Sequence, residues 1–121
     1  MKVNIKTTNL EMTPAIEQYL ERRINMIERF IDSTDQSAIA DVDIGKTTEH
    51  HHGGRIFRAE INLKLAGFFG RAEAVEYDLY DAINEAKKEI VRQIKNHYGN
   101  KKDSNVKKER SFKEILRNWR F

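Results

Sequence analysis

Basic side chains gather in the second half of this chain, in a segment whose apolar residues recur at helical spacing. Lys87, Lys88, Arg92 and Lys95 fall within residues 79–98. On a helix, Lys88, Arg92 and Lys95 are spaced i, i+4 and i+7, so they share one exposed ridge that Lys87 flanks. Such a ridge can follow a phosphate backbone, and a guanidinium can hold a phosphate through two hydrogen bonds. The pattern predicts a nucleic-acid surface. The alternative is a solvated helix face, because cations near a helix C-terminus also suit the helix dipole.

A run of three histidines is the second group that could do chemistry, here as metal ligands. Neighbouring side chains alternate sides in an extended segment, so of His50, His51 and His52 only the first and last could converge. The spacing offers no third ligand. We therefore expect no metal here and interpret the histidines as a loop cluster or as a contact to nucleic acid.

Two carboxylates, Asp41 and Asp43, share one face of a predicted strand and could suggest acid–base chemistry. No nucleophile–base pair, phosphate-binding loop or metal motif accompanies them, so a solvated strand face is the preferred interpretation. We expect a protein that is not an enzyme, with no catalytic residue, no cofactor and no small-molecule substrate.

The charge of the chain is divided between its two parts. Residues 1–78 hold 10 Lys and Arg against 13 Asp and Glu, a net charge of −3, and residues 79–121 hold 12 against 6, a net charge of +6. This division predicts an anionic partner for the C-terminal part, or a solvated helix with a soluble tail.

The 121 residues suffice for one domain, contain no cysteine and include no apolar run of ~18 residues, so we expect no disulfide and no membrane partner.

Hydrophobic periodicity predicts an α+β fold in the order β-α-β-β-β-α. Thr13 and Pro14 begin the first helix, and Asp78 caps the second. The expected strands cover residues 2–8, 38–48, 56–65 and 69–76, and the expected helices run from 14 to 32–33 and from 79 to 99. A helical crossover makes the first two strands parallel, and hairpins make the other pairs antiparallel. We therefore expect a four-stranded mixed sheet with both helices packed on one face.

The last residues form a different kind of segment. Residues 100–111 are polar and charged, as in a linker. Phe112, Ile115, Leu116 and Trp119 then recur at i, i+3, i+4 and i+7, which predicts a short amphipathic helix. We expect a basic tail over residues 99–121 whose apolar face docks on another protein, on RNA or on a second copy of the chain.

Short motifs follow one another in a fixed order over about residues 1–98. They are Asn9-Leu10, Thr13, Tyr19, Thr48, His50-His51, Gly54, Phe57-Arg58-Ala59-Glu60, Arg71-Ala72-Glu73-Ala74, Asp78-Leu79-Tyr80, Ala82-Ile83 and Arg92-Gln93. In this set the chain resembles the hibernation-promoting factor family, also called ribosome-associated inhibitors, in its short form. Many members of that family carry a lysine at the position of Glu89.

The resemblance implies a double-stranded-RNA-binding-like arrangement and a ribosome-binding domain over residues 1–98. The implied partner is the small ribosomal subunit, with its RNA and proteins, in the channel that messenger and transfer RNA occupy. Translation is then blocked by steric occlusion in a bacterial cytoplasm, as part of ribosome hibernation in stress or stationary phase. By position the resemblance assigns RNA contacts to Arg92 and Arg23, whereas Lys87, Lys88 and Lys95 are assigned by the ridge. We expect a monomer away from the ribosome.

Two other functions remain open at this point. A generic double-stranded-RNA-binding module would bind free duplexes as tightly as ribosomes. A protein-interaction regulator, such as a sigma-factor modulator, would bind its partner without help from Lys88, Arg92 and Lys95.

Overall fold

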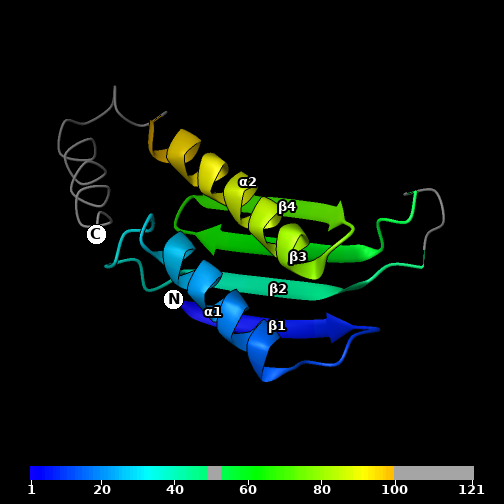
Figure 1. Ribbon diagram of the computed structural model, residues 1–121. Coiled ribbons are helices and arrows are strands. Elements are labelled where there is room, and N and C mark those ends of the chain that lie inside the picture. The colour runs from blue at the N-terminus through cyan, green and yellow to red at the C-terminus, as the bar shows by residue number, and fades with distance from the viewer. Residues whose placement is uncertain (49–52, 100–121) are drawn as a thin grey trace.

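The fold is known from a computed structural model, which describes residues 1–48 and 53–99 (Figure 1). The element order is β-α-β-β-β-α, as predicted. The elements are β1 (Lys2–Thr8), α1 (Pro14–Glu28), β2 (Ile39–Lys46), β3 (Phe57–Leu65), β4 (Phe68–Glu76) and α2 (Leu79–Gly99). In these described residues, no helix combines the length and the hydropathy that a membrane span requires.

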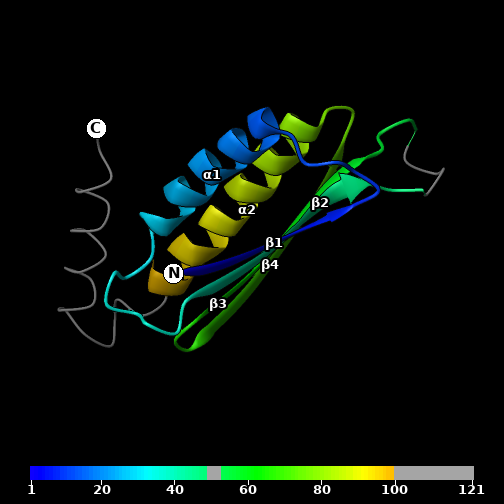
Figure 2. The same cartoon turned by 90° about the horizontal axis from the view of Figure 1, so that it is seen from below.

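The four strands form one sheet in the order β1-β2-β3-β4. β1 and β2 are parallel, and the β2–β3 and β3–β4 pairs are antiparallel. Both helices cover the same face of this sheet, with α1 beside α2 (Figure 2). The predicted mixed sheet with its helices on one face is therefore confirmed.

The core lies between the sheet and the helices, because alternate residues of each strand face the helical layer. Ala40, Val42 and Ile44 of β2 are at most 3% exposed. They meet apolar stripes that recur every three or four residues on the two helices. The buried helix residues are Ile16, Leu20, Ile24 and Ile27 on α1 and Leu79, Ala82, Ile83, Ala86, Ile90, Val91 and Ile94 on α2.

Both helix starts follow the predicted capping chemistry. The Thr13 hydroxyl accepts a hydrogen bond from the Ile16 backbone N–H at 3.2 Å. The Asp78 carboxylate accepts from the backbone N–H groups of Tyr80 and Asp81, at 2.7 and 3.3 Å. Each cap satisfies donors that the first helical turn leaves without a partner, so the two residues fix where the helices begin.

The first helix ends earlier than the sequence predicts, at Glu28 rather than at residues 32–33. Phe30 and Ile31 donate to carbonyl groups three residues back, which tightens the chain out of the α-helix. Both side chains are still buried, so the apolar period continues beyond the helix. The Asp32 backbone N–H then donates to the Tyr98 hydroxyl at 3.1 Å, which holds this turn against the end of α2.

The sheet differs from the prediction in strand bounds and in one exposed residue. β3 begins at Phe57 and β4 at Phe68, one residue after and one residue before the expected starts. β2 spans Ile39–Lys46, which is shorter than the expected 38–48. Ile5 alternates like a core residue but is 45% exposed. It belongs to β1, an edge strand, and α1 makes few contacts with that strand, so the helical layer leaves Ile5 partly uncovered.

Candidate nucleic-acid interface

The predicted basic residues of α2 line one groove on the helical side of the molecule. Its volume is about 290 Å³. Lys87, Lys88, Arg92 and Lys95 contribute their side chains, and Phe30 and Val91 form its apolar part. The structure thus brings the four cations of α2 together, beside the end of α1. It adds two apolar residues that the predicted ridge does not include.

Two of these cations already have acidic partners on the same helix. The Lys88 Nζ lies 3.2 Å from a carboxylate oxygen of Glu85. The Arg92 guanidinium binds both oxygens of Glu89, with Nε 2.9 Å from Oε2. Both pairs are solvent-exposed, so a ligand can reach the cations but must compete with the carboxylates for them.

Glu89 is held in place by more than Arg92. The Gln93 side-chain amide donates to Glu89 at 3.2 Å and to the Arg71 backbone carbonyl of β4 at 2.8 Å. The hydrogen bonds from Arg92 and then Gln93 lower the pKa of Glu89 to about 2. A lowered pKa means that the stabilising interaction is fully present above the ordinary value of 4.5 and is lost only as the pH falls towards 2. Glu89 therefore competes with any anionic ligand for Arg92 at physiological pH.

Removing this competitor should strengthen anion binding. We expect Glu89→Gln to raise the affinity for RNA about three- to tenfold, because Arg92 then offers its full charge to phosphate. Titration of a labelled RNA at several salt concentrations measures this effect. The plot of log affinity against log salt concentration should become steeper by an amount that corresponds to about one further phosphate contact. Asp81→Asn is the matched control for the loss of one negative charge on α2, because Asp81 lies in the first turn of the helix and does not line the groove. An affinity for the Glu89 variant at or below that of the unaltered protein would contradict the assigned competition.

Lys95 and Lys87 differ from these paired cations. The Lys95 Nζ lies 5.1 Å from the centre of the Phe30 ring, in a cation–π contact. Burial lowers the pKa of Lys87, and the nearby charges of Arg23, Lys88 and Lys95 lower it further. The structure records no carboxylate partner for Lys87 within residues 1–48 and 53–99. Lys87 therefore lies among three other cations, and no carboxylate of the described residues pairs with it.

Arg23 brings the first helix into this interface. It lies on α1, and its charge helps to lower the pKa of Lys87 on α2. A cation of each helix therefore lies near a cation of the other. Its guanidinium carbon lies 4.4 Å from the centre of the Tyr19 ring. The sequence pattern did not single out this contact, although the i, i+4 spacing of Tyr19 and Arg23 could have indicated it.

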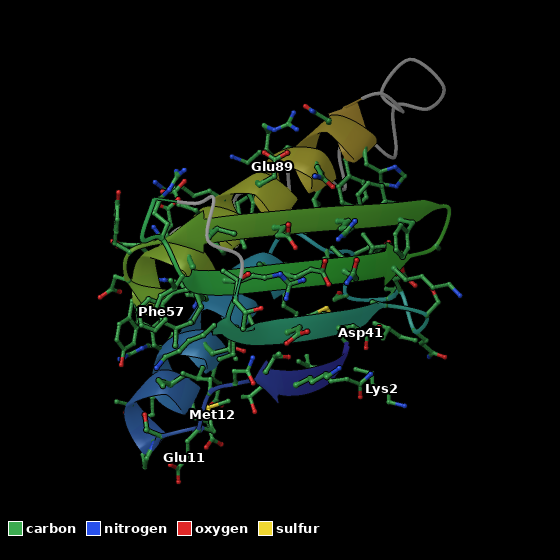
Figure 3. The ribbon with its side chains drawn as sticks, turned by 90° about the vertical axis from the view of Figure 1, so that its right-hand side faces the viewer. Lys2, Glu11, Met12, Asp41, Phe57 and Glu89 are labelled. Carbon is green, nitrogen blue, oxygen red and sulfur yellow. The ribbon has the colours of Figure 1, made fainter. Side chains whose placement is uncertain are left out.

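The opposite face of the sheet carries mixed charge (Figure 3). Asp41 accepts a hydrogen bond from Asn4 at 2.8 Å, and Asp43 accepts one from Thr8 at 2.9 Å. Arg58 lies 3.6 Å from Asp43 and also forms ion pairs with Glu60 and Glu73. The two strand carboxylates that could suggest acid–base chemistry thus make cross-strand contacts. The groove lined by the four cations of α2 is on the helical face.

Two groups of predicted contacts lie outside the described residues. They are His50, His51 and His52, and the tail residues Phe112, Ile115, Leu116 and Trp119. The roles predicted for them stay predictions.

The geometry defines a class of protein: a small α+β domain with a groove lined by cations on its helical face. The chain belongs to the Sigma 54 modulation protein / S30EA ribosomal protein family, whose profile matches residues 3–102. This confirms the family indicated by the ordered motifs, since several relatives are named as ribosome hibernation factors.

The relatives share the domain at modest identity. A "Ribosome hibernation promotion factor" of Bacillus subtilis is 31% identical over 97 residues, which are 80% of this chain and 48% of that protein. The chain thus spans about half the length of this relative. A "Ribosome hibernation promoting factor" of Klebsiella oxytoca is 29% identical over 97 residues, 80% of this chain and 93% of that protein.

Solved structures have the same fold. The N-terminal domain of Thermus thermophilus Protein Y superposes with a TM-score of 0.66 at 31% identity, covering 80% of this chain and 99% of that one. A ribosomal subunit interface protein of Coxiella burnetii superposes with a TM-score of 0.65 at 14% identity, covering 82% and 99%. The second likeness supports the fold alone.

Proposed function

We propose that this protein is a ribosome hibernation factor, which binds the small ribosomal subunit and inhibits translation by occupying the channel for messenger and transfer RNA. The observation that carries the proposal is the cluster of cations that two helices present on one face. Membership of the S30EA family and the names of its relatives support ribosomal RNA as the proposed ligand of this face. The cations are Arg23 of α1 and Lys87, Lys88, Arg92 and Lys95 of α2.

The proposed mechanism needs position and charge but no reaction. Ribosomal RNA presents closely spaced phosphates, which attract a groove of cations and release bound counterions when the protein docks. A folded domain held in the channel then excludes messenger and transfer RNA by its volume. The same proposal places the protein in a bacterial cytoplasm, as a monomer that acts without catalysing a reaction.

The first test is co-sedimentation of the purified protein with separated small and large ribosomal subunits over a salt series. We expect one protein to bind each small subunit, with affinity that falls as salt rises, and little binding to the large subunit. Free duplex RNA added as a competitor separates this function from a generic duplex-binding module. Binding to neither subunit, or equal affinity for free duplex, would reject the proposal.

A second candidate follows from the family's own description, which includes a sigma-54 modulation protein. A regulator of that kind would bind a protein partner, and neutralising Arg23 and Lys87 would leave its affinity unchanged. Measuring binding to a purified sigma factor with and without those substitutions distinguishes the two candidates.

A further inference from the structure

Arg23 of α1 is held in an unusual setting, near Lys87 of the groove but not among the residues that line it. Its guanidinium carbon lies 4.4 Å above the Tyr19 ring, and Nη1 lies 3.4 Å from the sulfur of Met26. Its Nε is buried and has no hydrogen-bond partner in the described part of the chain. An unpartnered buried donor is costly, so the packing that keeps the guanidinium on the ring must offset that cost.

Tyr19 is itself fixed by the second helix. Its ring meets Tyr80 edge to face, with ring centres 4.7 Å apart. Its hydroxyl donates to the Tyr80 backbone carbonyl at 3.3 Å. Tyr80 lies in the first turn of α2, so this contact joins α1 to α2 and leaves the Tyr19 ring little freedom to turn. The Arg23 guanidinium therefore rests on a rigid support.

The other arginines with described contacts are engaged differently. Arg58, Arg71 and Arg92 each bind carboxylates. Arg23 instead contacts an aromatic ring and a sulfur, and no carboxylate partner for it is recorded within residues 1–48 and 53–99. Its neighbour Lys87 is a second cation without such a partner. Two adjacent cations repel one another, and an anionic ligand would relieve that repulsion.

We propose that Arg23, Tyr19 and Lys87 form a site for one unpaired nucleotide of RNA. The base stacks on the Arg23 guanidinium, which Tyr19 supports from behind, and Lys87 binds the phosphate of the same nucleotide. Guanidinium planes are known stacking partners for unstacked bases, whereas the bases of a duplex are already stacked on one another. The site therefore selects single-stranded RNA over duplex.

This inference rests on the proposed function but adds to it. A purely electrostatic groove would bind any phosphate backbone, whereas a stacking site also responds to the base. The aromatic residues of the chain lie mostly at core spacing, which does not favour a stacking platform of exposed rings. In the proposed site the planar guanidinium of Arg23 stacks on the base, and the Tyr19 ring only supports the guanidinium.

The test compares two labelled single-stranded RNAs of equal length, one with its bases and one abasic, in fluorescence-anisotropy titrations. We expect the unaltered protein to bind the base-containing strand about 5- to 100-fold more tightly, as one stacked base contributes about 1–3 kcal/mol. Arg23→Lys keeps the charge but removes the plane. It should bind the abasic strand within about twofold of the unaltered protein and lose most of the preference for bases.

Tyr19 provides matched variants. Tyr19→Phe keeps the ring under Arg23 and should retain the preference for bases, whereas Tyr19→Leu should lose it. Circular dichroism of each variant confirms that it is folded. An unaltered preference in Arg23→Lys, the absence of any preference in the unaltered protein, or binding of neither strand would overturn the proposed site.

The same experiments separate this site from the proposed function. If the protein sediments with small subunits but shows no preference for bases, the nucleotide site is wrong and the function stands. If the preference depends on Arg23 but no ribosomal subunit is bound, the site stands and the function is wrong.

Discussion

Replacing Arg23 and Lys87 together by glutamate is expected to reduce the affinity for small ribosomal subunits about 100-fold or more. Both cations lack a carboxylate partner within residues 1–48 and 53–99, so both are available to phosphate. A hydrogen bond to a charged group contributes about 1.5–3 kcal/mol, and losing two such contacts corresponds to at least a 100-fold change. Sedimentation with small subunits over a salt series measures the affinity, and the salt dependence should become shallower.

The matched control reverses two cations on β1. Lys2 and Lys6 are exposed and alternate with the residues that face the helices, so they lie on the helix-free face of the sheet. Lys2→Glu with Lys6→Glu changes the net charge equally and should alter the affinity less than about threefold. Equal losses in both double variants would show that only net charge matters, and an unaltered affinity in the Arg23 and Lys87 variant would exclude the groove.

The cations of the interface differ in their availability to a ligand. Neutralising Lys88 and Arg92 with glutamine should weaken binding less than neutralising Arg23 and Lys87, because Glu85 and Glu89 already offset the first pair. A count of the charges along α2 gives equal weight to its four groove cations, three lysines and one arginine. Their partners decide which of them are available to a ligand.

The features that were predicted correctly, such as the strands and the helix starts, are those that adjacent residues determine. Alternation located the strands, and Thr13 and Asp78 located both helix starts, since capping is set by a few adjacent residues. The ridge on α2 followed from spacing alone. The ion pairs that engage Lys88 and Arg92 are also local, because each joins residues three apart on one helix.

The remaining features depend on how the elements pack. The periodicity beyond Glu28 reflects burial of Phe30 and Ile31 in a turn, which the apolar pattern cannot distinguish from further helix. The proximity of Arg23 to Lys87 arises from residues 64 positions apart that meet only when α1 lies beside α2. The exposure of Ile5 likewise depends on where α1 sits over the sheet.

Gly45→Ala is expected to destabilise the fold by about 3 kcal/mol. Gly45 pairs with Thr8 where the parallel strands β1 and β2 end. A Cβ added at Gly45 would lie 2.0 Å from the Thr8 backbone carbonyl oxygen, which no change of rotamer can relieve. The end of β1 must therefore move away from β2 and give up part of the pairing. Urea denaturation measures the effect as a lower midpoint, and an unchanged m-value shows that the extent of unfolding is the same.

Gly99→Ala is the matched control, because it makes the same chemical change at a position where the added Cβ meets no described atom within 4 Å. It should change the stability by less than about 1 kcal/mol. Gly45 does not line the basic groove, so the folded fraction of Gly45→Ala should bind ribosomal subunits with unaltered affinity. Equal stability of the two variants would show that β1 can shift at no cost. A loss of affinity in the folded Gly45 variant would instead mean that the end of β1 contributes to the interface, which the present assignment confines to the helical face.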